Sequence, residues 1–244
     1  MNIACWSGPR NLSTAMMYAF GARPDCGVWD EPFYAAYLAA SGADHPMRHA
    51  IIAAGETDPA RVGADCAAPD KDGQPHCYQK HMTQHMLWGL DQDWFDAVTH
   101  VFLIRHPARV LASYVAKREN PTLSDIGFVQ QAELYDAIVA RGHRPAIVDS
   151  FDIRTAPEAM LLALCARIGL SFDRRMLTWP TGGHADDGVW AAHWYGAVHA
   201  STGFAGPEGA LPDLPAALQP ISAAALPHYE RLKALALKPS EAEA

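Results

Sequence analysis

The loop from Ser7 to Thr14 carries the residue types that suit the binding of a phosphate group. Its sequence is Ser7-Gly8-Pro9-Arg10-Asn11-Leu12-Ser13-Thr14. An arginine can grip a phosphate through two hydrogen bonds, and hydroxyls add further donors. The loop follows a short apolar run and precedes a helical pattern, so free N–H groups and the positive end of a helix dipole would face the same anion. We therefore predict a nucleotide-phosphate site in this loop, at Arg10, Asn11, Leu12, Ser13 and Thr14.

A plain strand–helix turn is the alternative interpretation of this loop, with Asn11 as the helix cap and Arg10 as a solvated charge. The loop is not a Walker A sequence, because it lacks the Gly-Lys pair before the hydroxyl residue. That absence argues against an ATP-dependent small-molecule kinase.

A second set of residues suited to phosphate binding follows the apolar run from His100 to Ile104. Arg105 comes directly after this run, and Ser113 lies eight residues further on, within a helical pattern that Pro107 can start. Ligands of open α/β sheets gather where strands end, so Arg105 and Ser113 could reach the same phosphate. The alternative is an ordinary ion pair for Arg105 and simple packing for Ser113.

These candidates need a set of strands and helices to hold them. Apolar runs predict strands at residues 2–6, 28–29, 77–79, 100–104 and 145–149. Helical patterns occupy residues 12–20, 34–40, 85–90, 107–119, 125–141, 156–168 and 223–237, whereas residues 55–75 have the composition of an irregular loop. Alternating strands and helices predict an α/β fold, a doubly wound and mostly parallel sheet flanked by helices, in one domain over residues 1–244.

Composition narrows the possible partners and the compartment. The 244 residues carry a net charge of -8, which argues against binding to nucleic acids or to anionic membranes. The five cysteines include no Cys-x-x-Cys pair, and neither a signal peptide nor a bilayer-spanning apolar run is evident. We therefore expect a cytoplasmic protein with reduced thiols, and the histidine spacings predict no metal site.

Three segments, in this order along the chain, resemble the sulfotransferases that use 3′-phosphoadenosine 5′-phosphosulfate (PAPS). The loop at Arg10 resembles the family's 5′-phosphosulfate loop, with Ser13-Thr14 as its hydroxyl pair. The segment HVFLIRHPARVLASY (residues 100–114) resembles the 3′-phosphate motif, with Arg105, Pro107 and Ser113 in place. The segment VDSFDIRTAPEAMLLALCARIGLSF (residues 148–172) resembles a structural part of the family.

The chain is thus identified as a member of this P-loop NTPase-like family, similar to its bacterial and plant sulfotransferase-like members. The resemblance implies sulfonate transfer from PAPS, as co-substrate, to a hydroxyl or amine of a small-molecule acceptor, with no metal required. The family's late basic loop, which adds cations at the 3′-phosphate, has no clear copy here. An ATP-dependent kinase and a nucleotide-binding protein without catalysis are the alternatives.

The resemblance also implies catalytic residues. A base near the acceptor is expected, and Glu31, at the end of the second strand, is the first candidate, with Asp30 behind it. Lys80 and His81 end the third strand, where the family places a lysine and a histidine. Neighbours in a strand point to opposite faces of the sheet, so only one of the two residues can face the site without a bend in the strand. We expect Lys80 to lie at the sulfonate, and His81 is the rival base. Trp190, Trp194 and Tyr195 form an aromatic cluster at helical spacing, which indicates either core packing or a pocket wall.

Overall fold

The core of the molecule is a five-stranded sheet with the strand order β2-β3-β1-β4-β5. The computed structural model describes residues 1–68, 73–87, 89–116 and 120–239. Every neighbouring pair of strands in the sheet is parallel. The strands are β1 (Asn2–Ser7), β2 (Cys26–Asp30), β3 (His76–Met82), β4 (Thr99–Ile104) and β5 (Ala146–Asp149). The predicted α/β fold with a doubly wound parallel sheet is therefore confirmed.

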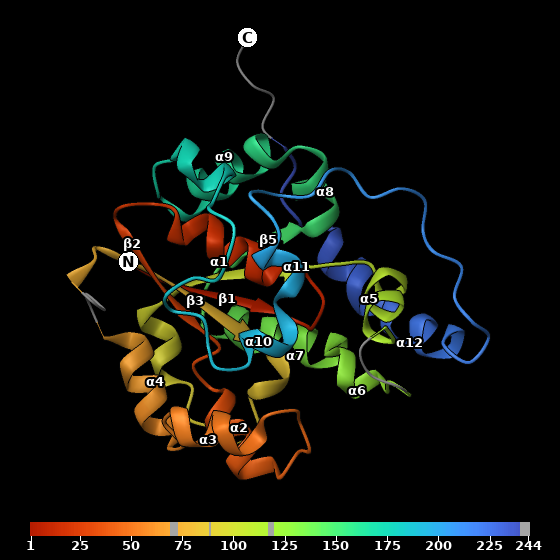
Figure 1. Cartoon of the computed structure of the whole chain (residues 1–244), viewed down its shortest axis with the longest axis horizontal. Coiled ribbons are helices and arrows are strands. Elements are labelled where there is room, and N and C mark those ends of the chain that lie inside the picture. The colour runs from red at the N-terminus through yellow and green to blue at the C-terminus, as the bar shows by residue number, and fades with distance from the viewer. Residues whose placement is uncertain (69–72, 88, 117–119, 240–244) are drawn as a thin grey trace.

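Helices cover both faces of the sheet (Figure 1). One face packs against α1 (Ser13–Gly21) and α9 (Pro157–Ile168). The opposite face packs against α4 (Pro59–Ala67), α5 (Pro107–Tyr114), α7 (Phe128–Ala140) and α12 (Gln219–Lys233). Strand β4 serves both layers, because Val101 and Leu103 point to the first cluster and Phe102 and Ile104 to the second. This two-sided burial explains the continuous apolar runs in the sequence.

Shorter helices complete the covering of the sheet. They are α2 (Tyr34–Ser41), α3 (Arg48–Ala54), α6 (Leu123–Ile126), α8 (Ser150–Thr155), α10 (Ala191–Trp194) and α11 (Gly196–His199). The 3₁₀ turns η2 (Thr83–His85), η3 (Asp93–Ala97) and η4 (Arg174–Leu177) follow or precede the larger elements. None of the helices in the described residues is both long and apolar enough to cross a membrane.

The prediction of an irregular loop over residues 55–75 is wrong for the centre of this range, where α4 forms. Asp58 caps this helix by accepting a hydrogen bond from the backbone N–H of Ala60 at 3.0 Å, and Pro59 stands at its start. Burial of Val62 and Cys66 against the sheet stabilises a segment whose composition favours a loop.

Other helix boundaries also differ from the sequence-based expectation. Gly127 has a φ of 72° and divides the helix predicted for residues 125–141 into α6 and α7. Only the turn η2 forms near the helix predicted for residues 85–90, and position 88 lies outside the described residues. Helix α5 ends at Tyr114, and residues 117–119 are likewise outside them.

The carboxyl ends of the central strands are fastened together by side-chain amides. The backbone oxygen of Leu103, near the end of β4, accepts hydrogen bonds from Asn11 Nδ2 at 2.6 Å and from Gln131 Nε2 at 2.9 Å. Gln131 Nε2 also donates to the backbone oxygen of Trp6 at 3.1 Å. The loop after β1 is therefore held against β4 by buried hydrogen bonds that are costly to break.

Replacing Leu103 by alanine should destabilise the protein by about 2–5 kcal/mol, because this fully buried side chain fills the layer between β4 and α1. Urea unfolding monitored by circular dichroism measures the loss. Leu235, which is 55% exposed, provides the matched control, and Leu235→Ala should change stability by less than about 0.5 kcal/mol. Equal effects of the two substitutions would contradict the packing described here.

Candidate active site

A cavity of about 360 Å³ opens at the carboxyl ends of the strands. Such an edge is where ligands bind in open α/β sheets. The cavity brings together nearly all the residues that the sequence singled out, namely Arg10, Asn11, Leu12, Ser13, Thr14, Glu31, Lys80, Arg105 and Ser113. Of the predicted site residues, His81 and the weaker base candidate Asp30 do not line it.

The two predicted phosphate segments touch each other directly. Arg10 Nε donates a hydrogen bond to Ser113 Oγ at 2.9 Å, although 103 residues separate the two positions. One terminal nitrogen of Arg105 donates to the backbone oxygen of Arg10 at 2.6 Å. Burial, and then the charge of Arg105, lowers the pKa of Arg10. Two guanidinium groups held this close to each other make a site that favours an anion.

The backbone of the loop after β1 is strained and closely packed. Arg10 and Leu12 have φ values of 58° and 63°, in the left-handed region that disfavours ordinary side chains. A Cβ at Gly8 would lie 2.7 Å from the backbone oxygen of Ile126, so only glycine fits there. No side chain among the described residues caps helix α1, and Asn11 ties the loop to β4 instead of capping the helix. The first N–H groups of α1 are therefore left for another acceptor.

Lys80 forms a buried polar cluster at the other end of the cavity. Its ammonium donates to Asp30 Oδ1 at 2.9 Å, to Glu31 Oε1 and to the hydroxyl of Tyr195 at 2.6 Å. The Tyr195 hydroxyl in turn donates to the carboxylate of Asp30 at 2.8 Å. Lys80 and Asp30 are almost wholly enclosed, whereas Glu31 keeps 10% of its side chain exposed and lines the cavity.

The charges of this cluster do not balance, because one ammonium serves two carboxylates. Burial raises the pKa of Glu31, and Asp30 adds to the rise while Lys80 opposes it. Burial by itself would lower the pKa of Lys80, but Asp30 and Glu31 outweigh that effect and raise it. The result is a firmly charged lysine beside a carboxyl group that accepts a proton more readily than an ordinary glutamate.

The structure corrects the assignment of His81 to the acceptor site. Its ring stacks on Trp6 with centroids 4.5 Å apart, and its Nε2 pairs with Gln79 Oε1 at 3.1 Å on the face opposite Lys80. Burial lowers the pKa of His81 to about 3, so the ring is neutral. Strand alternation sends Lys80 to the cavity and His81 into the core.

An aromatic wall closes the cavity beside Glu31. The ring of His85 lies between those of Tyr34 and Tyr37, with centroid separations of 4.5 and 4.7 Å, and His85 and Tyr34 both line the cavity. Trp194 and Tyr195 line the cavity as well. The pocket-wall interpretation therefore holds for these two residues, whereas Trp190 packs into a buried cluster.

Sequence reasoning missed the polar role of Tyr195 and the place of His85. Tyr195 meets Lys80 across 115 residues, and no local pattern signals such a contact. Burial lowers the pKa of His85 well below its ordinary value, so a neutral imidazole stands 3.9 Å from Glu31 Oε2. Within the described part of the chain, no group of three or more metal-ligating side chains has the geometry to hold a metal ion.

A comparison with protein families decides the assignment of this chain. The sequence profile described as Sulfotransferase domain matches residues 1–236. The chain belongs to the sulfotransferase domain family. The predicted membership of the sulfotransferases is thereby confirmed, and the family supports sulfonate transfer as the chemistry of this domain.

Two curated relatives of this sulfotransferase domain come from Arabidopsis thaliana. Branched-chain-amino-acid aminotransferase-like protein 1 is 34% identical over 231 residues, which are 95% of this chain and 41% of that protein. Branched-chain-amino-acid aminotransferase-like protein 2 is 36% identical over 207 residues, which are 84% of this chain and 36% of that protein. The chain thus spans about two-fifths of the length of these relatives.

Solved structures show the same fold as this sulfotransferase domain. The sulfotransferase domain from the curacin biosynthetic pathway has a TM-score of 0.53 and 13% identity, with 97% of this chain and 98% of that chain covered. The sulfotransferase domain from the Synechococcus PCC 7002 olefin synthase has a TM-score of 0.52 and 17% identity, with 93% and 94% covered. The parallel sheet with helices on both faces is common to all three.

Replacing Lys80 by methionine should destabilise the protein by about 3–5 kcal/mol at neutral pH, because Asp30 and Glu31 lose their buried counter-charge. The deficit should shrink as the pH falls. In the variant, the Glu31 carboxyl group loses the lowering effect of Lys80, so it binds protons more tightly in the folded state than in the unfolded state, and acid favours the folded state.

Urea unfolding at neutral and mildly acidic pH measures this effect. The exposed Lys238 provides the control, and Lys238→Met should change stability by less than about 0.5 kcal/mol at either pH. A Lys80→Met deficit that grows on acidification would contradict the role of Lys80 as a counter-charge.

Proposed function

We propose that this sulfotransferase domain transfers a sulfonate group from PAPS to a hydroxyl or amine of a small-molecule acceptor. One observation carries the proposal: the loop at Arg10, the Arg105–Ser113 pair and the Glu31–Lys80 pair all line a single cavity. Donor binding and acceptor activation are thereby available side by side in one cavity, as group transfer requires.

The residues on the donor side fit the phosphate groups of PAPS. Arg105 Nε is buried and has no hydrogen-bond partner among the described residues, so a donor is left over for a ligand. The left-handed loop and the uncapped start of α1 add N–H groups that suit an anion. In this proposal Arg10, Asn11, Leu12, Ser13 and Thr14 hold the 5′-phosphosulfate, and Arg105 and Ser113 hold the 3′-phosphate. When bound, PAPS supplies a sulfonate group already activated for transfer.

Glu31 is the proposed base. Its carboxylate lines the cavity, and its raised pKa makes it a better proton acceptor than an ordinary glutamate. The ammonium of Lys80 opposes the rise in the pKa of Glu31 and provides positive charge beside the sulfonate. Tyr34 and Trp194 line this side of the cavity and give it an apolar wall.

Calorimetry should detect binding of 3′-phosphoadenosine 5′-phosphate (PAP) to the wild-type protein without magnesium. Arg105→Ala should weaken this binding by about 1.5–3 kcal/mol, because a charge-assisted contact to the 3′-phosphate is lost. The exposed Arg174 is the matched control, and Arg174→Ala should leave the affinity unchanged. Absence of PAP binding would refute the proposed donor, and magnesium-dependent ATP binding in its place would favour the kinase alternative.

Glu31→Gln should lower kcat about a hundredfold or more while leaving PAP affinity intact, because it removes the base and not the phosphate contacts. Forward transfer from PAPS to a panel of phenols and amines measures kcat without knowledge of the natural acceptor. Burial raises the pKa of Glu31, so this base becomes protonated earlier as the pH is lowered. Wild-type kcat should therefore begin to fall on acidification at a higher pH than it would with an ordinary glutamate as the base.

That acidic fall in kcat should disappear in Glu31→Gln. Glu133, which is exposed on α7, is the control position, and Glu133→Gln should keep both kcat and its pH profile. A full kcat in Glu31→Gln would assign the base to another group. A protein that binds PAP but transfers sulfonate to none of the acceptors would favour the non-catalytic alternative.

A further inference from the structure

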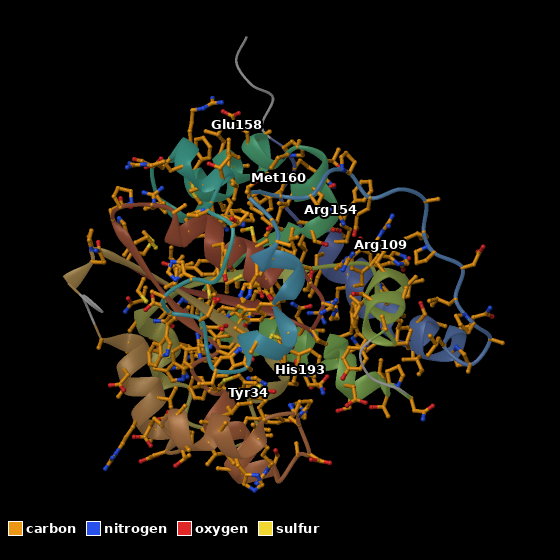
Figure 2. All side chains as sticks on the ribbon, viewed as in Figure 1. Tyr34, Arg109, Arg154, Glu158, Met160 and His193 are labelled. Atoms are coloured by element: carbon orange, nitrogen blue, oxygen red, sulfur yellow. The ribbon has the colours of Figure 1, made fainter. Side chains whose placement is uncertain are left out.

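Three arginine side chains converge on the carboxylate of Glu208. Arg105 follows β4, Arg109 lies in α5 and Arg154 lies in α8, whereas Glu208 belongs to the segment between α11 and α12. Arg154 donates to Glu208 Oε1 at 2.8 Å, Arg109 Nε lies 3.2 Å from Oε2, and Arg105 also contacts Oε1. The Glu208 side chain is only 3% exposed, so its ion pairs with the arginines are buried and do not lie on the surface. Figures 1 and 2 show this segment passing α5 and α8 where Arg109 and Arg154 are labelled.

The charges around Glu208 favour a more negative occupant. One carboxylate faces three guanidinium groups. The nearby carboxylates of α8 and β5, Asp152 and Asp149, lie 2.6 and 2.9 Å from the ammonium of Lys233 and are thereby paired. A phosphate monoester carries more negative charge than a carboxylate and offers more acceptor oxygens to arginine forks. The cluster therefore suits a phosphate better than the side chain it holds.

The arginine cluster is continuous with the cavity. Arg105 lines the cavity and contacts Glu208 at the same time. Gly203 and Ala205, on the segment that leads to Glu208, also form part of the cavity wall. Arg154 Nε donates to the backbone oxygen of Gly206 at 2.9 Å, so the arginines hold the segment as well as its carboxylate. A ligand that contacts Arg105 from the cavity thus shares this guanidinium group with the carboxylate of Glu208.

We propose that Arg109 and Arg154 join Arg105 in an anion subsite for the 3′-phosphate of the donor, and that Glu208 holds this subsite as a displaceable internal anion. The identity of the donor rests on the proposed function. The sequence has no clear copy of the late basic loop that would add cations at the 3′-phosphate. In this subsite Arg109 from α5 and Arg154 from α8 provide those cations instead.

A tethered carboxylate competes with the incoming phosphate, because only the fraction of molecules with Glu208 displaced can bind at full strength. Glu208→Gln keeps the size of the side chain and removes its charge. This variant should bind PAP about five- to tenfold more tightly than the wild type. Its affinity for 5′-AMP, which has no 3′-phosphate, should stay the same.

Two further variants test the specificity of this effect by calorimetry. Glu158 makes an exposed ion pair with Arg174, so Glu158→Gln should leave both affinities unchanged. Arg154→Ala should weaken PAP binding several-fold and spare 5′-AMP, because it removes a guanidinium from the subsite and leaves Glu208 in place. An unchanged or weaker PAP affinity in Glu208→Gln would overturn the proposal, as would equal tightening for both nucleotides.

Inorganic phosphate separates a failure of the subsite from a failure of the proposed donor. Without its carboxylate, the arginine cluster is left with uncompensated charge, so phosphate should raise the Tm of Glu208→Gln more than that of the wild type. Adding Arg154→Ala to this variant should remove the extra shift. If no nucleotide binds but this pattern appears, the subsite stands and the donor assignment falls. If phosphate gives no extra shift in Glu208→Gln, the subsite is overturned.

Discussion

The burial of the Lys80 ammonium is the constraint on which the architecture around the cavity depends. A charge removed from water must be met by groups of opposite charge at short range. Asp30 and Glu31 at the end of β2 meet it from one side, and the hydroxyl of Tyr195 meets it from the segment after the last strand. The edge strand β2, the inner strand β3 and the helices α10 and α11 are thereby held in a fixed relation by one nitrogen atom.

Unfavourable backbone geometry gathers at the same place. Arg10, Leu12 and Glu31 all have positive φ values, and all three line the cavity. Such conformations cost free energy and persist only where the surrounding packing imposes them. Here the fastening comes from Asn11 on β4 and from Lys80 on Glu31. The side chains of the site are therefore set in position before any ligand arrives.

The sequence was sufficient to predict the sheet and to single out residues that line one cavity, because both depend on local patterns. Buried parallel strands give continuous apolar runs, and Arg105 and Ser113 follow such a run at a readable spacing. The choice between Lys80 and His81 needed the strand's orientation, which sequence alternation leaves open. Contacts such as that of Glu208 with the arginines were out of reach, since an irregular segment brings them together only in the folded chain.

The Lys80 cluster also limits how this chain can diverge over time. Asp30, Lys80 and Tyr195 come from three distant segments, yet each satisfies a hydrogen bond or a charge of the others. Loss of any one member leaves a buried polar group without its partner, which single substitutions elsewhere do not repair. A change at one of these positions therefore calls for compensating changes at the other two.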